Sequence, residues 1–269
     1  MIQNFKNNGY EIVDFEEISD IYVVNTCTVT NMSDRKSRQV LRQAKKKNPD
    51  AIVVACGCYV QVAQKEIEEI NEIDLVLGTN EKSKIVDFVE EFISSKNKEK
   101  DYFIEIDNVM QNKEFCDFGS VTYTEKTRAV IKVQDGCDRF CSYCIIPYAR
   151  GRVRSRKPES VIKEVNEIAK NGIKEVVITG IHVASYGKDF KEEYRLIDLL
   201  EEINRIEGIE RIRLRINRTS FNYRRICWKI KESGKNLPSF SFISTKWMYR
   251  NFKNNEQKIY NWRIWRNCK

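Results

Sequence analysis

The sequence predicts an α/β protein with two parallel-sheet domains in succession. Short β-branched apolar runs alternate with amphipathic segments of helical period, and this alternation occurs twice along the 269 residues. A polar, mixed stretch at 96–126 separates the two sets, and we interpret it as a linker with a short strand. Strands that alternate with helices pair in parallel, and the length suffices for two domains of ordinary size.

The first set occupies residues 1–95. Strands are expected at 21–26, 51–57 and 73–79, and helices at 33–49 and 82–95. Ser33 is a suitable N-cap for the first of these helices, and Asn48-Pro49 ends it. The opening stretch, MIQNFKNNGYEIVDF, predicts a helix followed by a strand. Because such a domain usually begins with a central strand, we expect that a segment is missing ahead of Met1.

The second set occupies residues 127–214. Strands are expected at 128–135, 174–180 and 211–214, and helices at 157–172 and 194–208. Pro158 stands near the start of the first helix and Gly172 at its end, which is the usual placement of these two residues. Three strand–helix units in a row predict a parallel barrel or half-barrel.

The net charge of +8 is unevenly distributed. Residues 215–269 carry 14 Lys and Arg against two acidic residues, together with all four tryptophans. The first 214 residues carry 33 Lys and Arg against 37 acidic residues. Both the helical and the strand periods also disappear after Leu214. Because the excess of positive charge lies in a segment without periodicity, it does not indicate an RNA-binding surface.

The composition favours a cytoplasmic protein. No apolar run reaches the roughly 18–20 residues that a membrane span needs, and no secretory leader is visible at the start. Nine cysteines without such a leader indicate a reducing compartment. There, closely spaced cysteines indicate metal or redox chemistry rather than disulfides.

The strongest signal is GCDRFCSYCIIPYARGRVRSR, residues 136–156, which places Cys137, Cys141 and Cys144 at the spacing C-x3-C-x2-C. Three thiolates can hold three irons of a cubane cluster and leave the fourth iron open for a small molecule. Tyr143 adds an aromatic face beside the third cysteine. A structural zinc site is the alternative, but zinc needs a fourth ligand, for which His182 is the possible partner.

Four segments together resemble the methylthiotransferases of the radical S-adenosylmethionine (SAM) superfamily. They are NTCTVTN at 25–31, GCY at 57–59, the cysteine loop, and ITGIHVASYG at 178–187. The resemblance covers residues 1–214, and the details at 25–39 and 179–182 are closest to the MtaB-type branch, the threonylcarbamoyladenosine tRNA methylthiotransferases. It implies an incomplete flavodoxin-like domain followed by the first half of a radical-SAM (β/α)6 partial barrel.

The resemblance also implies cofactors and site residues. Cys137, Cys141 and Cys144 would bind a [4Fe-4S] cluster whose open iron holds SAM. Tyr143 would lie against the adenine, and Thr179 and Gly180 would line the SAM amino group. A second [4Fe-4S] cluster in the N-terminal domain would take Cys27, Cys58 and a third cysteine that is expected ahead of Met1. No residue is assigned a catalytic role of its own.

The implied reaction is methylthiolation of N6-threonylcarbamoyladenosine beside the tRNA anticodon. The implied partners are the anticodon stem-loop, an electron donor such as flavodoxin or ferredoxin, and a sulfur donor that the sequence does not identify. Two alternatives stay open: methylthiolation of a ribosomal-protein aspartate, and a non-enzymatic iron–sulfur or zinc-binding fragment. We expect this exact chain to be inactive on tRNA, because half the barrel and one cluster ligand are missing from the pattern.

The remaining candidates have ordinary alternatives. The basic run of Arg150, Arg152, Arg154, Arg156 and Lys157 would either meet tRNA phosphates or form a solvated loop. Cys56 and Cys116 have no match in the family pattern, and we interpret them as ordinary thiols.

We interpret residues 215–269 as an out-of-frame translation without a selected fold. Codons can be chosen from Arg215 onward so that a one-base shift gives GSIEPHLITEEFV, which restores the Gly-Ser-x-Glu-Pro motif of the family. The same shift turns residues 237–247 into CPHFHLSLQSG, which resembles the next barrel strand.

Overall fold

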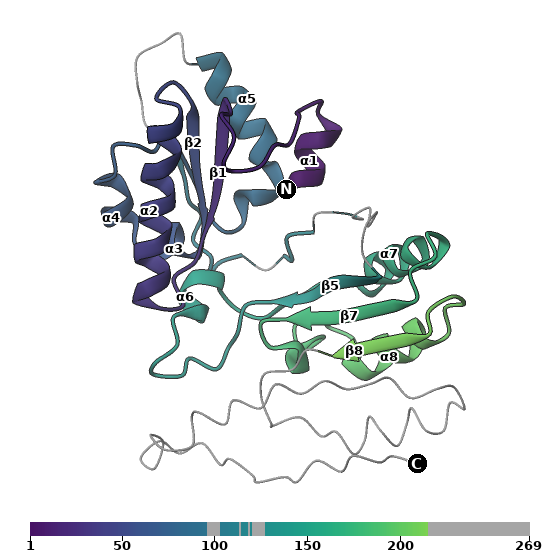
Figure 1. Ribbon diagram of the computed structural model, residues 1–269. Helices are drawn as coiled ribbons and strands as arrows, with labels where there is room; N and C mark the ends of the chain where they lie inside the picture. Colours follow the sequence, from purple (N-terminus) through teal and green to yellow (C-terminus); the bar gives the residue numbers. More distant parts are fainter. Residues whose placement is uncertain (96–102, 113, 118, 120–126, 215–269) are drawn as a thin grey trace. The chain divides into compact units, whose positions relative to one another are not determined.

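The computed structural model describes residues 1–95, 103–112, 114–117, 119 and 127–214 (Figure 1). These residues form two compact units. The first consists of the described residues up to 119 together with 135–156, and the second of 127–134 together with 157–214. The predicted out-of-frame tail, 215–269, lies outside the described residues.

A four-stranded parallel sheet forms the centre of the first unit. Its strands are β1 (Ile21–Thr26), β2 (Ile52–Gly57), β3 (Leu75–Leu77) and β4 (Phe103–Glu105), in the order β1-β2-β3-β4. β2 is buried along its whole length, as expected for a central strand of a sheet covered on both faces. The parallel α/β arrangement predicted for this part is therefore confirmed.

Helices cover both faces of this sheet. They are α1 (Ile2–Asn7), α2 (Asn31–Lys47), α3 (Cys58–Val62), α4 (Gln64–Glu68), the 3-10 turn η1 (Glu81–Lys84) and α5 (Ile85–Ser95). Leu41 of α2 and Ile67 of α4 join one apolar cluster, whereas Phe5 of α1 and Val89 of α5 join the other. Figure 1 shows α2 and α5 on opposite sides of the strands.

Two local predictions in this unit were wrong. Helix α2 begins at Asn31, and its N-cap is Thr30, whose hydroxyl accepts a hydrogen bond from the Ser33 amide at 3.2 Å. Ser33 is therefore inside the helix that it was expected to cap. The strand expected at 10–15 is absent, and Ile12 and Val13 stay 41% and 39% exposed. β1 is the edge strand of the described sheet, and this segment does not pair with it.

The stretch expected to be a linker contributes a strand to the first sheet. β4 pairs in parallel with β3, with Leu75 opposite Phe103. The segment after the second set's first strand also belongs to the first unit, and it contains α6 (Ile146–Arg150) and the two-residue strand β6 (Arg154–Ser155). The cysteine loop at 137–144 is therefore grouped with the sheet that carries Cys27 and Cys58.

The second unit contains the parallel strands β5 (Arg128–Asp135), β7 (Glu175–Gly180) and β8 (Arg211–Leu214), in the order β5-β7-β8. Its helices are α7 (Pro158–Lys170), the 3-10 turn η2 (Val183–Ser185) and α8 (Leu196–Asn204). One apolar cluster joins Ile131 and Ile178 of the strands to Val165 of α7 and Leu199 of α8. The described residues contain two of the three predicted strand–helix units and the strand of the third, β8, in the parallel arrangement that was predicted.

No helix in the described ranges is long and apolar enough to span a membrane.

Candidate functional site

Cys27 and Cys58 follow the last register pair of two neighbouring strands. Thr26 of β1 is opposite Gly57 of β2, and each of these residues is followed directly by a cysteine. Gly57 has φ +112°, and a Cβ built on it would lie 2.4 Å from the Thr26 carbonyl oxygen. Only glycine allows this close approach, so the two strand ends stay together. Cys27 is exposed and Cys58 is buried.

The sulfur of Cys58 has a cationic partner. The Nε of Arg150 donates a hydrogen bond to the Cys58 Sγ at 2.9 Å, and its Nη1 lies 3.4 Å from the Asp135 carboxylate. Burial acts to lower the pKa of Arg150, but Asp135 and the Cys58 thiol raise it above its ordinary value. Arg150 therefore remains a cation between a carboxylate and a sulfur.

Hydrogen bonds from two side chains to backbone carbonyls fix the position of Arg150. Its carbonyl oxygen accepts from Arg154 Nη2 at 2.7 Å, and the carbonyl of Ala149 accepts from the Thr79 hydroxyl at 2.8 Å. The next residue, Gly151, has φ +75°, and a Cβ there would lie 2.1 Å from the Val109 carbonyl oxygen. The end of α6 is therefore held on both sides of Arg150.

The cysteine loop begins and ends with tight backbone contacts. The Cys137 amide donates to the Gly151 carbonyl at 3.0 Å, and the Cys144 amide donates to the Cys141 carbonyl at 2.9 Å. Between them, Phe140 has φ +44°, the one positive φ of a non-glycine residue in the described part of the chain. Residues held in such conformations cost energy and concentrate at functional sites.

One aromatic ring and one guanidinium pack against the strained residue, Phe140. The Phe140 ring packs edge-on against Tyr148, with ring centroids 5.9 Å apart, and the Arg152 guanidinium lies 4.9 Å from the Phe140 centroid. Tyr143, predicted to lie against adenine, is 45% exposed in the same loop. Its side chain is therefore partly open to solvent.

The donor set fits an iron–sulfur cluster by its chemistry. Cys137, Cys141 and Cys144 lie on one short loop, are partly exposed, and form no disulfide. Within the described ranges, no three Cys, His, Asp or Glu side chains are gathered closely enough to hold a single metal ion. A cubane cluster does not require such convergence, because each thiolate binds a different iron. Cys27 and Cys58 supply two further thiols at the sheet edge.

Two arginines of the basic run are buried, and for these two neither predicted role holds. Arg154 is 1% exposed, and its Nη1 donates to Asn80 Oδ1 at 2.8 Å. Arg156 is 5% exposed and is bonded to Asp117 at 2.9 Å. Arg152 is the exposed arginine of the run, with its side chain 58% accessible. Arg154 and Arg156 therefore stabilise the loop, rather than facing solvent or RNA.

Thr179 and Gly180 lie in the second unit, at the carboxyl end of β7. Gly180 is opposite Gln134 of β5, and a Cβ on Gly180 would lie 2.9 Å from the Gln134 carbonyl oxygen. The fully buried Gln134 accepts a hydrogen bond from the His182 amide at 2.7 Å. The ends of β5 and β7 are therefore joined through a side chain that the sequence analysis did not single out.

Two further thiols of the described part are Cys56 and Cys116, which the sequence analysis interprets as ordinary cysteines. Cys56 is fully buried in the apolar cluster on the α5 side of the sheet, and burial raises the pKa of its thiol. The Cys116 Sγ donates a hydrogen bond to the Asn80 carbonyl oxygen at 3.4 Å.

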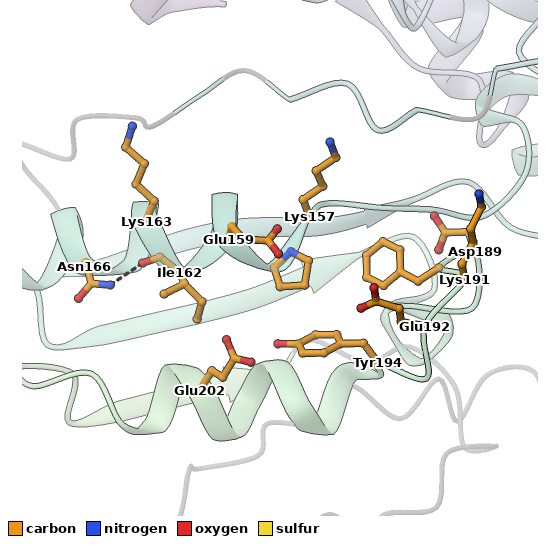
Figure 2. Close-up of a pocket in the computed structure, with 12 residues that line it drawn as sticks. Lys157, Glu159, Ile162, Lys163, Asn166, Asp189, Lys191, Glu192, Tyr194 and Glu202 are labelled. Carbon is orange, nitrogen blue, oxygen red and sulfur yellow. Dashed lines mark hydrogen bonds between the residues drawn. The ribbon is translucent and has the colours of Figure 1, made fainter.

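The second unit also has an open groove of about 780 Å³, which is lined by Lys157 of the basic run but by none of the predicted cluster or SAM ligands. Figure 2 shows Ile162 and Asn166 of α7 on one side and Tyr194 with Glu202 on the other. Burial and the Glu202 carboxylate raise the pKa of Tyr194. The residues that line the groove all belong to the second unit, whereas the cysteine loop is grouped with the first.

Two family models match this chain. The model described as Radical SAM superfamily matches residues 131–267, which is half of the chain and includes the cysteine loop. The chain belongs to the radical SAM superfamily. A second model, Uncharacterized protein family UPF0004, matches residues 1–78. The radical SAM match extends over most of the segment that we interpret as out of frame.

Two curated relatives match most of this chain. The threonylcarbamoyladenosine tRNA methylthiotransferase MtaB of Aquifex aeolicus is 46% identical over 210 residues, which are 78% of this chain and 50% of that protein. The protein of the same name from Bacillus subtilis is 43% identical over 213 residues, which are 79% of this chain and 46% of that protein. The chain therefore spans about half the length of the curated relatives that it matches.

A second group of relatives is less similar. A tRNA-2-methylthio-N(6)-dimethylallyladenosine synthase of Clostridium perfringens is 32% identical over 214 residues, 77% of this chain and 46% of that protein. Among solved structures, the radical SAM methyltransferase TsrM of Kitasatospora setae has a TM-score of 0.49 at 16% identity, over 75% of this chain and 44% of that chain.

Proposed function

We propose that the chain represents a radical-SAM tRNA methylthiotransferase acting on N6-threonylcarbamoyladenosine. The observation that carries the proposal is the difference in identity between two groups of relatives. Identity is 46% and 43% to the threonylcarbamoyladenosine enzymes and 32% to a dimethylallyladenosine enzyme over nearly equal lengths. The product would be 2-methylthio-N6-threonylcarbamoyladenosine, beside the anticodon.

The cysteine loop would hold the first [4Fe-4S] cluster through Cys137, Cys141 and Cys144. The cluster with SAM at its open iron supplies a 5′-deoxyadenosyl radical on reduction. Tyr143 presents an exposed ring for the adenine, and the strained Phe140 fixes the turn between the first two ligands. Thr179 and Gly180, at the end of β7, would contact the SAM amino group. The protein's contribution is to bind and orient these groups.

The carboxyl edge of the first sheet would hold the second [4Fe-4S] cluster. Cys27 and Cys58 are adjacent in the strand register, and thiolates are the ligands that such clusters take. The sulfur that enters the product would be handled there. The proposed partners are a tRNA anticodon stem-loop and an electron donor of the flavodoxin or ferredoxin type.

The proposal is tested by reconstituting the chain with iron and sulfide without oxygen and adding a strong reductant, SAM and tRNA. We expect 5′-deoxyadenosine from the parent chain and none from Cys141→Ala, whereas Cys116→Ala behaves like the parent. Because the chain spans half of its relatives, the Bacillus subtilis relative serves as the positive control for methylthiolation itself.

Substrate choice is tested with three acceptors. For the product of the corrected reading frame, tRNA that carries N6-threonylcarbamoyladenosine should stimulate 5′-deoxyadenosine formation, whereas tRNA with N6-dimethylallyladenosine should not. Stimulation by a ribosomal-protein aspartate instead would show the alternative branch. Zinc in place of iron, with no SAM cleavage, would overturn the enzymatic proposal altogether.

A further inference from the structure

We propose that Gln134 is a positioning residue for bound SAM, because its side chain holds the backbone that follows β7, where Thr179 and Gly180 would meet the SAM amino group. The inference rests on the proposed function, since it takes SAM to bind there. Gln134 lies outside the four segments that carry the family resemblance. The residues proposed for the first cluster and for SAM all lie within this chain, so the inference can be tested on the chain as it stands.

The end of β5 is irregular where Gln134 lies. Lys132 is opposite Thr179. Two positions later, Gln134 is opposite Gly180, so the strand register shifts between the two pairs as in a β-bulge. Such irregularities redirect a side chain and are common beside active sites. Gln134 is fully buried at this point, and a buried polar side chain needs hydrogen-bond partners.

One partner of Gln134 is the backbone just beyond β7. The His182 amide donates a hydrogen bond to Gln134 Oε1 at 2.7 Å. Gly180 leaves room for this contact, because a Cβ built on it would lie 2.9 Å from the same oxygen. Gln134 therefore reaches the His182 amide across a position that has no side chain.

The segment after β7 is also fixed at its far end. The His182 carbonyl accepts a hydrogen bond from the Ser185 amide at 2.7 Å, and its Nδ1 lies 2.5 Å from the Ser185 hydroxyl oxygen. Val183 and Tyr186 are 2% and 1% exposed and join the apolar cluster of the second unit. The backbone that leaves β7 is therefore held at both ends before SAM binds.

A fixed backbone at 179–182 has a direct consequence for SAM. The amino group of SAM donates hydrogen bonds, so the residues that meet it need acceptors, such as the Thr179 hydroxyl or backbone carbonyl oxygens. When acceptors are held in position beforehand, binding has less order to impose on the protein. Loss of the Gln134 acceptor should therefore weaken SAM binding while the cluster ligands stay intact.

The test uses the full chain with Cys27→Ala and Cys58→Ala, reconstituted with iron and sulfide without oxygen, so that only the first cluster is followed. Gln134→Met has a similar length but no oxygen acceptor, whereas Gln134→Glu keeps one. Val165→Ala, from the apolar cluster of the same unit, is the control for a loss of stability alone.

Two quantities are measured on each variant. The first is the SAM concentration at which half of the electron paramagnetic resonance signal of the reduced cluster has shifted. The second is the rate of amide hydrogen exchange at 179–183 in the same chains without a cluster. Iron and sulfide per chain and the denaturation midpoint accompany both measurements.

We expect Gln134→Met to need about tenfold more SAM than the background, with unchanged iron and sulfide and with faster exchange at 179–183. Gln134→Glu should stay close to the background, because the His182 amide keeps an acceptor. Val165→Ala should lower the denaturation midpoint without changing the SAM requirement. If Gln134→Met does not fold, Gln134→Asn takes its place, because the shorter amide does not reach His182.

An equal SAM requirement in Gln134→Met and the background would overturn the inference, as would a weakening of SAM binding that Val165→Ala reproduces. In either case the background still responds to SAM, so the proposed function stands while the role of Gln134 does not. A background chain that binds no cluster, or whose signal SAM leaves unchanged, would overturn the proposed function and the inference together.

Discussion

Thr26 and Gly57 face each other as the last register pair of β1 and β2, and a cysteine follows each of them. Parallel strands place their carboxyl ends at one edge of a sheet, where α/β proteins bind ligands. Two thiols that are 31 positions apart in the sequence therefore leave the sheet at neighbouring points. The close approach at Gly57 makes this arrangement depend on one residue that lacks a side chain.

Replacing that glycine should damage the sheet edge. Gly57→Ala places a Cβ 2.4 Å from the Thr26 carbonyl oxygen at a φ of +112°, so we expect a loss of about 2–4 kcal/mol in the free energy of unfolding. Gly9→Ala is the matched control, because Gly9 also has a positive φ but no atom within 4 Å of its Cβ position. Urea denaturation measures both, and an equal loss in the two variants would mean that the contact with β1 is unimportant.

The buried arginines should act on stability rather than on RNA binding. Arg154→Ala removes a guanidinium that is 1% exposed and leaves the Arg150 carbonyl and Asn80 without this donor. We expect a loss of about 2–4 kcal/mol, against less than about 0.5 kcal/mol for Arg152→Ala. Denaturation and tRNA affinity at several salt concentrations are the measurements. If Arg154→Ala weakens tRNA binding while stability is unchanged, the run is an RNA contact after all.

Glu81 should make stability depend on pH. Its side chain lies in η1 and is buried, which raises the pKa of its carboxyl group, and the neighbouring Asp107 carboxylate raises it further. The folded state then favours the protonated acid. Its contribution is complete below the ordinary pKa near 4.5 and is lost as the pH rises through the raised value.

Glu81→Gln removes this titration. We expect the variant to be more stable than the parent by about 1–2 kcal/mol at pH 7, with a difference that shrinks as the pH falls toward 4.5. Chemical denaturation of both proteins at several pH values checks this. A difference that grows on acidification would show that Glu81 is ionised and stabilised in the fold.

The reading frame after Leu214 can be tested on the DNA itself. The out-of-frame interpretation predicts that resequencing with flanking bases finds a lost or gained base near this codon, and that the corrected frame encodes GSIEP. If resequencing confirms the present reading frame, the out-of-frame interpretation is rejected. The radical SAM match to residue 267 would then apply to the tail as it stands.

The periodic part of the fold could be predicted from sequence. Runs such as 21–26 and 128–135 coincide with β1 and β5, because burial on a sheet imposes both their composition and their length. The N-cap of α2 was predicted three residues too late, at Ser33 instead of Thr30. Both residues are good caps, and the choice depends on which hydroxyl accepts a hydrogen bond from a backbone amide of the first turn.

Of the candidate site, only the ligand residues could be predicted from the sequence, and the residues that support them could not. Cysteine spacing indicates thiolate chemistry directly, and family resemblance adds Thr179 and Gly180. The supporting residues Arg150, Asp135 and Gln134 carry no local pattern, because their roles depend on contacts with distant segments. The inward turn of Arg154 and Arg156 follows from Asn80 and Asp117, which no periodicity places beside them.

The central claim is that the loop of Cys137, Cys141 and Cys144 holds a cluster with an iron open to SAM. The most direct measurement is electron paramagnetic resonance of the reconstituted, reduced Cys27→Ala, Cys58→Ala variant before and after addition of SAM. We predict a [4Fe-4S] signal whose g values shift on addition of SAM, and no such signal once Cys141→Ala is added. A signal that SAM leaves unchanged, or iron bound equally well without Cys141, would contradict the account.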